Sequence, residues 1–311
     1  MRHILPAKRL VGIDLINLAA RDITSFIEVS EAQYQKRIEA AADAVLASQR
    51  HLVMLTGPSA AGKTTSANRL AAEIRKRGLR SMVVSLDDFF VGAGKYPKRP
   101  DGGEDFECVE ALNLPLLRSC LRQLCETGEC DAPIFDFLAA QPAKETRHID
   151  CRGGVAVIEG LHAFNPVLTE HLPAQSVMNI YASLREEYAG ADGRRLIETR
   201  DIRLARRLTR DWLFRGHDAA FTLALWPHVC QSEDLYIKAF KKRADLVLDT
   251  SFSYEPCLWK GYTENMQAGK FETEMRQLAG RFAGFALIPP ERVPTDSMLR
   301  EFIGQENRPP Q

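Results

Sequence analysis

The sequence has no long apolar run, no low-complexity tract and no excess of charge of either sign. A membrane span needs roughly 18 or more consecutive apolar residues, and Lys8, Arg9 and Asp14 interrupt the apolar patches near the N-terminus. Lysine plus arginine and aspartate plus glutamate both number 41, which disfavours a nucleic-acid binder that works through bulk charge. We therefore expect no membrane anchor, no signal peptide and no nucleic-acid partner.

The sequence also lacks paired cysteines. Its seven cysteines form no C-x2-C pair, and an odd number is typical of reduced thiols in a cytoplasmic protein. Its histidines show no metal-ligand spacing. With 45% hydrophobic and 26% charged residues, the chain has a globular composition, and 311 residues suffice for one large α/β domain with appendages or for two modest domains.

The most informative stretch runs from residue 52 to residue 65. An apolar run, Leu52 to Leu55, is followed by Gly57, and the pattern G-x4-G-K-S/T is completed by Gly62, Lys63 and Thr64. This pattern indicates a strand, a phosphate-binding loop and a helix, in which backbone N–H groups cradle a nucleotide's phosphates. A chance glycine-rich turn is the alternative, but the strand before it and the helix after it favour the loop. The nucleotide-binding residues would be Gly57, Ser59, Ala60, Ala61, Gly62, Lys63, Thr64 and Thr65.

Two further features of this loop point to ATP and Mg²⁺. Lys63 would reach the β- and γ-phosphates, and the Thr64 hydroxyl would coordinate Mg²⁺. The start of the following helix adds its partial positive charge to the same anion site.

Two aspartates follow the second predicted strand, at residues 81–86. Parallel sheets place ligands at the carboxyl ends of their strands, so Asp87 and Asp88 would lie beside the phosphate loop. A kinase needs a carboxylate there to orient and deprotonate the attacking hydroxyl. The alternative is a pair of turn or N-cap aspartates.

Hydrophobic periodicity predicts the remaining elements. Helices are expected at 30–48 with Ser30 as N-cap, 63–78, 109–126, 201–216, 219–242 with a break near Pro227, and 264–282. Further strands are expected at 154–158, 176–182 and 244–248, and an interrupted hairpin at 128–152. Residues 4–18 could form a strand and a turn, a polar loop is expected after residue 182, and we assign residues 1–29 no function.

Together these segments resemble the uridine kinase and phosphoribulokinase family, in particular its uridine-kinase-like branch. The resemblance rests on the phosphate loop, on Ser85 to Phe90, on Gly103 to Glu107, on Pro133 to Phe137, on Val155 to His162 and on Arg203 to Gly216. Val293 to Gly304 is similar to the tail of longer bacterial members. Those members carry an N-terminal region related to threonyl-tRNA synthetase, which we expect this chain to lack. The resemblance covers residues 30 to 305.

The resemblance implies roles for four acidic residues. Asp87 matches the family's catalytic aspartate and would also lie next to Mg²⁺. Glu159, at the end of the third apolar strand, matches the acid that holds Mg²⁺, although it could instead be a helix-starting glutamate. Glu107 falls where the family places a carboxylate that grips two ribose hydroxyls, and Asp105 competes for that role.

The arginine-rich helix of residues 201–216 would be the lid of this family. A dense cationic helix is often only a solvated surface, but positive charge over the transferring phosphoryl group is what the reaction needs. Arg207, Arg210 and Arg215 match the family's contacting arginines, so we expect Arg210 and Arg215 to be catalytic, Arg210 also to bind the nucleotide, and Arg207 to contact substrate.

Three positions on the acceptor side differ from true uridine kinases. Phe135 stands where those enzymes have a tyrosine, Ala140 where they have a base-reading histidine, and His217 where they have an arginine that helps to hold uridine. Phe135 and His217 are therefore candidate substrate-binding residues that do not match pyrimidine recognition.

We thus expect an α/β fold of the P-loop NTPase type: a doubly wound, mostly parallel sheet of about five strands with helices on both faces, a lid helix and a substrate-covering insertion. The expected divisions are residues 1–49, an N-terminal extension with the leading helix; 50–260, the kinase domain with its lid at about 198–217; and 261–311, a C-terminal extension.

The expected function is an ATP- and Mg²⁺-dependent kinase that phosphorylates a hydroxyl of a small metabolite, either a nucleoside or a sugar-like compound. A kinase for a non-nucleoside acceptor and a nucleotide sensor with little transfer activity are the alternatives. A GTPase or a motor-type ATPase is disfavoured because neither an Asn-Lys-x-Asp motif nor a Ser-Gly-Gly signature is present. A homo-oligomer is possible.

Overall fold

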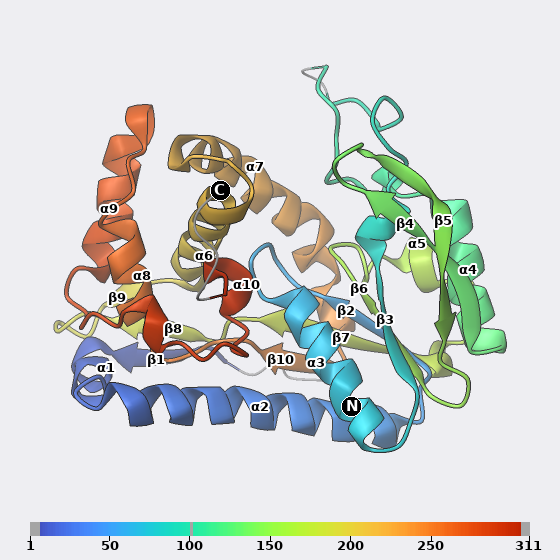
Figure 1. The fold of residues 1–311 in the computed structure, drawn as a ribbon, viewed down its shortest axis with the longest axis horizontal. Helices are drawn as coiled ribbons and strands as arrows, with labels where there is room; N and C mark the ends of the chain where they lie inside the picture. The colour runs from blue at the N-terminus through green and yellow to red at the C-terminus, as the bar shows by residue number, and fades with distance from the viewer. Residues whose placement is uncertain (1–6, 100–101, 306–311) are drawn as a thin grey trace.

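The computed structural model describes residues 7–99 and 102–305, and within them the central feature is a five-stranded parallel sheet. Its order is β10 (Leu246–Asp249), β7 (Val177–Ser183), β2 (Leu52–Thr56), β6 (Val155–Glu159) and β3 (Ser81–Ser85). Every neighbouring pair is parallel, so all carboxyl ends lie at one edge. The doubly wound parallel fold expected from the sequence is confirmed (Figure 1).

Helices cover both faces of this sheet because its strands are apolar on both sides. Val53 and Leu55 belong to a hydrophobic cluster with α2 (Ile23–Ser48), α3 (Lys63–Lys76), α6 (Thr199–Phe214) and α8 (Glu255–Thr263). Leu52 and Met54 belong to another cluster, with α4 (Leu114–Glu126) and α5 (Pro166–Thr169). Side chains of a buried parallel strand alternate between two apolar layers, and both layers are filled here.

The leading helix starts earlier than predicted. It begins at Ile23, where the Asp22 side chain accepts a hydrogen bond from the Ser25 N–H. Ser30, the predicted N-cap, is buried inside the helix and donates its hydroxyl to the Phe26 carbonyl. The prediction was wrong because an internal serine that bonds back to the preceding turn leaves the same sequence signal as a cap.

A small second sheet was missed in part. It consists of β1 (Arg9–Gly12), β8 (Glu186–Ala189) and β9 (Arg195–Ile197), and β1 pairs with β8 in parallel. The strand and turn considered for residues 4–18 correspond to β1 and α1 (Ile13–Ala19), although residues 4–6 lie outside the described part of the chain. The polar loop expected after residue 182 was wrong, because β8 and β9 lie there. Strand β8 was missed because it pairs with β1, where Arg9 lies opposite Glu186, 177 residues along the chain.

The insertion between the second and third strands of the fold is close to expectation. After the turn η2 (Val109–Ala111), Asn113 caps α4, and β4 (Glu129–Asp136) pairs with β5 (Gln141–Asp150) as an antiparallel hairpin. The pairing register shifts between Pro133 and Phe135, where proline cannot donate a ladder hydrogen bond.

The C-terminal third departs from the predicted boundaries. Helix α7 (Ala219–Tyr236) continues through Pro227, so the break expected there is wrong, and η4 (Lys238–Arg243) follows it. The single helix expected at 264–282 is only α9 (Glu272–Phe282), preceded by the separate α8. A last short helix, α10 (Arg300–Ile303), brings the chain back against α6 (Figure 1).

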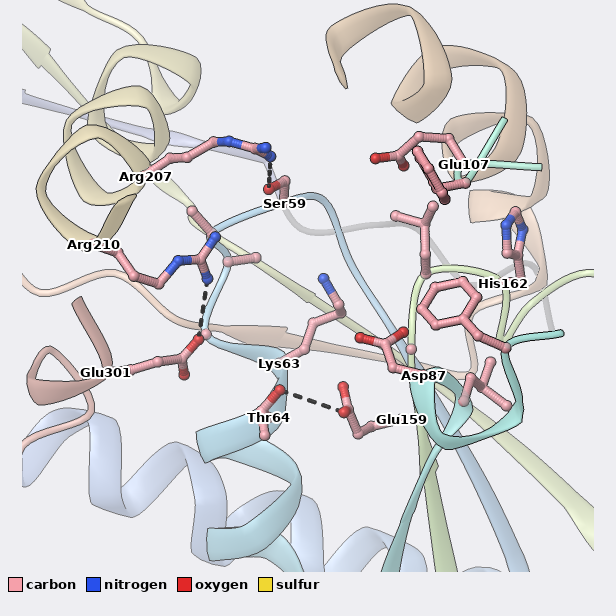
Figure 2. A pocket seen from close by; sticks show the side chains of 18 of the residues that line it. Ser59, Lys63, Thr64, Asp87, Glu107, Glu159, His162, Arg207, Arg210 and Glu301 are labelled. Carbon is pink, nitrogen blue, oxygen red and sulfur yellow. Dashed lines mark hydrogen bonds and ion pairs between the residues drawn. The ribbon is translucent and has the colours of Figure 1, made fainter. Parts of the chain in front are cut away.

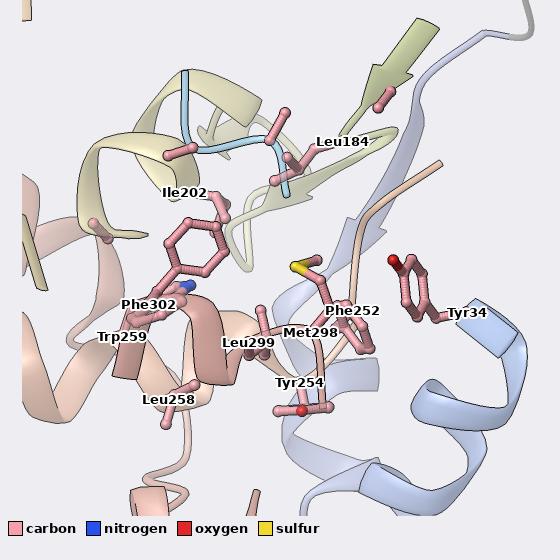
Figure 3. Close-up of a cluster of buried hydrophobic side chains, with 14 of the residues drawn as sticks. Tyr34, Leu184, Ile202, Phe252, Tyr254, Leu258, Trp259, Met298, Leu299 and Phe302 are labelled. Atoms are coloured by element: carbon pink, nitrogen blue, oxygen red, sulfur yellow. The ribbon is translucent and has the colours of Figure 1, made fainter. Parts of the chain in front are cut away.

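The C-terminal segment is part of the main core. Met298, Leu299 and Phe302 are completely buried, in the same cluster as Trp259 and Phe252 (Figure 3). The cluster contains residues from all three of the predicted divisions. Among the described residues, no helix combines the length and the apolar character needed to cross a bilayer.

Candidate functional site

The phosphate loop connects β2 to α3 at the carboxyl edge of the sheet, as its pattern predicts. Gly62 and Ala60 both adopt the left-handed backbone conformation, with φ angles of 77° and 58°. This conformation is uncommon for Ala60, because that residue carries a Cβ atom. A Cβ on Gly57 would lie 2.1 Å from the Ala182 carbonyl oxygen. Gly57 therefore lets the loop pack against β7 and does not line the pocket.

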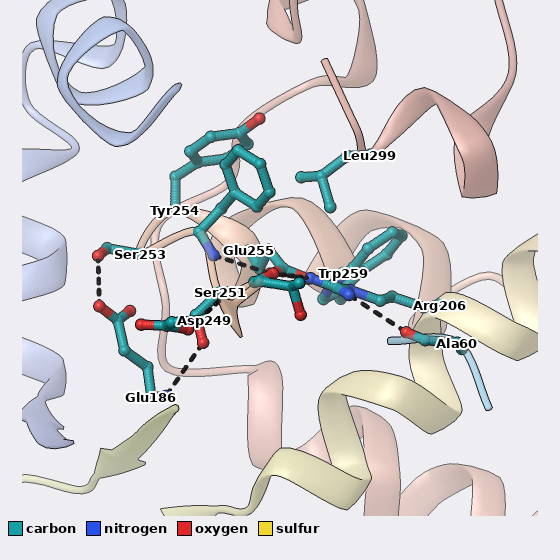
Figure 4. A network of polar contacts seen from close by, with 12 residues as sticks. Ala60, Glu186, Arg206, Asp249, Ser251, Ser253, Tyr254, Glu255, Trp259 and Leu299 are labelled. Carbon is teal, nitrogen blue, oxygen red and sulfur yellow. Dashed lines mark hydrogen bonds and ion pairs between the residues drawn. The ribbon is translucent and has the colours of Figure 1, made fainter. Parts of the chain in front are cut away.

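Two buried arginines hold the loop in this shape. Arg206 forms an ion pair with Glu255 at 2.6 Å and donates to the carbonyl oxygens of Ala60 and Thr250 (Figure 4). Arg203 pairs with Glu233 and donates to the Ser59 carbonyl at 2.9 Å, while Glu233 accepts from the Ser59 N–H. These two arginines of the cationic helix are structural, and removing one partner of such a buried pair is strongly destabilising.

A cavity of about 300 Å³ opens above the loop. It is lined by the loop, by the ends of β3 and β6, by the lid helix and by the C-terminal segment. The predicted residues that line it are Ser59, Ala60, Ala61, Gly62, Lys63, Thr64, Asp87, Glu107, Glu159, Arg207, Arg210 and Arg215.

The acidic side of the cavity contains Asp87 and Glu159 (Figure 2). The Glu159 carboxylate accepts from the Ser85 hydroxyl at 2.9 Å and from the Thr64 hydroxyl at 3.4 Å. Burial, and then repulsion from Asp87, raises the pKa of Glu159 to about 7. Asp87 is open to the solvent of the pocket, but the surrounding protein still raises its pKa above the ordinary value, against the attraction of Lys63.

Lys63 lies between the acidic and the basic sides. Its ammonium group donates to the Pro58 carbonyl at 3.2 Å, and Figure 2 shows it directed into the space between Asp87 and the lid arginines. Burial lowers the pKa of Lys63, while Glu159, Asp87 and Glu301 raise it.

The basic side consists of lid arginines. Arg207 donates to the Ser59 hydroxyl at 2.9 Å, and Arg210 lies 3.9 Å from Glu301. Arg215 lies at the end of the helix, 3.3 Å from Asp211, and its side chain is 48% exposed. Burial, and then repulsion from Arg215, lowers the pKa of Arg210 to about 10. Arg207 lowers it further, so the lid places three mutually repelling arginines at this side of the cavity.

Three predicted substrate residues and two predicted nucleotide residues, Thr65 and the Gly57 described above, lie outside the cavity lining. Asp105 accepts from the Glu107 N–H at 3.0 Å, Phe135 packs against Phe90, and His217 stacks on Phe221. Thr65 donates its hydroxyl to Glu301 at 2.6 Å. Asp88 faces the hairpin, where it pairs with Arg147 at 3.3 Å.

Two lining residues with polar side chains, Glu301 and His162, had no functional role in the sequence analysis. Glu301 reaches the cavity from α10, and only the similarity of residues 293–304 to a family tail drew attention to that segment. His162 was named as the last residue of a family-like motif. It lines the cavity, and burial lowers its pKa to about 4, so its imidazole is neutral.

Oxygen donors suited to Mg²⁺ meet at one point of the cavity. The Thr64 hydroxyl and the Glu159 carboxylate lie together, with Asp87 nearby. Among the described residues, no group of three or more His, Cys, Asp or Glu side chains could hold a metal ion alone. This sparse set fits Mg²⁺, which usually binds one or two carboxylates together with substrate phosphates and water.

Comparison with known proteins agrees with this geometry. Residues 52–181 match the model of the Phosphoribulokinase / Uridine kinase family. Uridine kinase of Mycoplasma genitalium is 27% identical over 202 residues, which span 64% of this chain and 85% of the relative. Uridine kinase of Saccharomyces cerevisiae is 25% identical over 201 residues, and the aligned part covers only 36% of that protein.

Solved structures were also compared. A possible uridine kinase from Bacillus stearothermophilus has a TM-score of 0.49 at 20% identity, covering 70% of this chain and 100% of that one. D-glycerate 3-kinase from Cryptococcus neoformans has a TM-score of 0.32 at 16% identity, covering 81% and 85%. The match of residues 52–181 to the phosphoribulokinase and uridine kinase family model agrees with the resemblance described above.

Proposed function

We propose that this protein is a kinase that transfers the γ-phosphate of ATP to a hydroxyl group of a small metabolite. The observation that carries the proposal is the position of Asp87, a carboxylate at the end of β3 that faces Lys63 and Arg215 across the phosphate-loop cavity. The family and the curated relatives are named as kinases, which supports the same class of reaction.

The reaction would use both sides of the cavity. Asp87 accepts the proton of the acceptor hydroxyl, the hydroxyl oxygen forms a bond to the γ-phosphorus, and the bond from that phosphorus to the β–γ bridging oxygen breaks, leaving ADP. Lys63, Arg210 and Arg215 stabilise the negative charge on the transferring group and the leaving oxygen. When bound, Mg²⁺ neutralises part of the phosphate charge, and Thr64 and Glu159 would hold it with Asp87 beside it.

The state of Asp87 fits this role. A general base works best when its pKa approaches the working pH, and the cavity raises the pKa of Asp87 from its ordinary value. The cationic groups opposite, Lys63 and Arg215, limit this rise in the pKa of Asp87.

The acceptor is proposed to be a polyol or sugar-like molecule, either as such or as the ribose of a nucleoside. Glu107 offers two acceptor oxygens to a vicinal diol, and Phe90, Phe106 and His162 provide apolar and neutral surfaces around it. Burial raises the pKa of Glu107, and Arg207 partly opposes that rise.

One observation favours a non-nucleoside acceptor as a second candidate. Among the described residues, none of the hairpin positions 128–152 lines this cavity; the hairpin residues Phe137 and Arg147 line only an adjoining one, beside Asp87. Phe135 instead fills the space behind Phe90, with 5.7 Å between ring centroids.

The test is a coupled assay of ADP release with Mg·ATP against nucleosides, free sugars, polyols and hydroxyl-bearing amino acids. Turnover with one class identifies the acceptor, and product analysis should show a phosphate ester. If the wild-type protein binds Mg·ATP tightly but transfers phosphate to no member of the panel, the nucleotide-sensor alternative replaces the kinase.

A further inference from the structure

A second cavity, of about 230 Å³, lies on the other side of the phosphate loop. It is bounded by Pro58 of the loop, by the end of β7 and the turn after it, by the first residues of α6, and by η4. It shares no lining residue with the candidate active site. Like that site it lies at the carboxyl edge of the sheet, where parallel folds bind ligands.

The lining of this second cavity is strongly basic. Its cations are Lys8, Arg185, Arg200, Arg203, Lys238 and Lys241, and its single acid is Glu198. Four of the cations form ion pairs with carboxylates outside the lining: Lys8 with Glu187, Arg200 and Lys238 with Asp234, and Arg203 with Glu233. Within residues 7–99 and 102–305, neither Arg185 nor Lys241 forms an ion pair.

Arg185 is buried without a counterion of its own. The residue is 6% exposed, and its Nε has no hydrogen-bond partner; the same is true of the buried Ser183 hydroxyl beside it. Asp249 attracts it, but that carboxylate already pairs with Arg9 and Arg37. Burial lowers the pKa of Arg185, which reflects the cost of holding this charge away from water.

Lys241 adds a second uncompensated charge to the same cavity. Its ammonium group lies 5.0 Å from the centre of the Tyr181 ring. Burial lowers the pKa of Lys241, and Arg185, Lys8 and Lys238 lower it further by repulsion. Buried polar and charged groups normally have partners, so a buried arginine, a partly buried lysine and an unsatisfied buried hydroxyl around one cavity favour an anion as its ligand.

We propose that this cavity binds the phosphate group of a small phosphorylated metabolite, with the Arg185 guanidinium, the Lys241 ammonium and the Ser183 hydroxyl as its ligands. Two uncompensated positive charges match a phosphate dianion. A guanidinium group donates two parallel hydrogen bonds to phosphate oxygens, and a hydroxyl completes the set. The volume leaves room for a few carbon atoms beyond the phosphate.

The occupied cavity would border the nucleotide site. Arg203 lines the cavity and also donates to the Ser59 carbonyl of the phosphate loop, and Pro58 forms part of the cavity wall. A ligand here is therefore in a position to influence the loop without entering the active site.

The proposal is tested with inorganic phosphate on full-length protein carrying Lys63→Ala, which weakens phosphate binding at the phosphate loop. Binding is followed by phosphorus NMR titration. In this background we expect saturable binding at one site, at least tenfold weaker when Arg185→Gln or Lys241→Gln is added. Lys242→Gln, an exposed neighbour in η4, is the matched control and should bind as the background does.

A second measurement separates a binding role from a structural one. If Lys241 serves a ligand, Lys241→Gln should unfold at a higher temperature than wild type without phosphate, because repulsion is relieved, and phosphate should stabilise it less. Absence of saturable binding, or unchanged affinity in Lys241→Gln, overturns the proposal, even if Arg185→Gln fails to fold. The outcome does not depend on whether the protein is a kinase.

Discussion

The phosphate side and the acceptor side of the proposed active-site cavity differ in how they are built. The phosphate side comes from one continuous segment, Ser59 to Thr64, fixed by the buried pairs of Arg203 and Arg206. The acceptor side is assembled from separate segments around Asp87, Glu107 and His162, and the hairpin beside it contributes no lining residue. The phosphate side, built from one rigid segment, suits a nucleotide phosphate, which many kinases bind. The acceptor side, built from separate segments, suits an acceptor that differs from one kinase to the next.

The largest effect is expected from the phosphate side. Lys63→Ala should abolish detectable turnover, because no other loop residue supplies positive charge to the β- and γ-phosphates. Steady-state ADP release with the identified acceptor measures it. Lys76→Ala, at the exposed end of the same helix, is the control. Turnover of Lys63→Ala at the wild-type rate would refute the assignment of the site.

On the acceptor side, Asp87→Asn should lower the transfer rate by ~10²- to 10⁴-fold, the usual cost of losing a general base. Mg·ATP affinity should change little, because the loop is intact. Measuring rate and affinity together distinguishes chemistry from binding.

Asp88→Asn is the matched control for this change. Asp88 pairs with Arg147 on the hairpin and does not line the cavity, so its loss should cost much less. If Asp88→Asn were inactive and Asp87→Asn active, the assignment of the base would be wrong by one residue.

The lid arginines should affect the rate more than binding. Arg210→Ala and Arg215→Ala are each expected to reduce kcat by roughly 10²-fold, with a smaller rise in the KM for ATP, because the charge that they face develops in the transition state. Arg194→Ala, in the exposed turn after β8, should have no effect. If a variant bound ATP more weakly but kept the wild-type kcat, the arginine would contact the nucleotide equally in the ground state and in the transition state.

Glu159 lies between the two sides and allows a test without any ligand. Its folded-state pKa of about 7 exceeds the ordinary 4.5, so its stabilising contribution is complete below about pH 4.5 and is lost as pH rises through 7. In metal-free protein, Glu159→Gln should therefore match wild type at low pH and be more stable at pH 8 by about 3 kcal/mol, at ~1.4 kcal/mol for each pKa unit.

Urea unfolding at the two pH values measures the difference. Glu110→Gln, an exposed substitution of the same type, is the control and should show no such pH dependence. Equal stability of Glu159→Gln and wild type at pH 8 would mean that burial does not raise the pKa of the Glu159 carboxyl group.

The same contrast explains how much could be predicted from the sequence. The phosphate loop, Asp87 and Glu159 follow from local pattern, because each directly follows an apolar strand and parallel strands end at one edge. The five-strand fold follows from the same periodicity. The pairing of β1 with β8 depends on a distant contact and could not be predicted. The helix start was missed for a local reason, because Ser30 inside the helix gives the same sequence signal as the true cap, Asp22.

The arginines of the lid helix α6 show what could not be predicted from the sequence even within one helix. Sequence alone shows a row of arginines, but the structure divides them by helical face. Arg203 and Arg206 point to buried glutamates contributed by α7 and α8, while Arg207 and Arg210 line the cavity. The division depends on acids that are 30 and 49 residues away, which no local pattern reveals.

Glu301 is the clearest case of a site residue placed by tertiary structure. Its helix is held by buried Met298 and Phe302, and Arg206 and Arg210 lie 5.1 and 5.7 Å from the Phe302 ring centre. A Cβ on Gly62 would lie 2.6 Å from the Met298 sulfur, so the segment packs directly on the phosphate loop. This packing brings a carboxylate into contact with Thr65, next to the predicted phosphate site.

The smallest predicted effect follows from that carboxylate. Glu301→Gln removes a negative charge near the nucleotide's phosphates but keeps an oxygen that accepts from Thr65, so Mg·ATP should bind roughly fivefold more tightly, the ~1 kcal/mol that a unit charge exerts over about 4 Å in a water-filled site. Calorimetric titration of Mg·ATP measures this, with Glu274→Gln on the exposed face of α9 as control. Weaker binding by Glu301→Gln would show instead that this carboxylate holds the nucleotide, for example through its ribose hydroxyls, and that the C-terminal segment completes the nucleotide site.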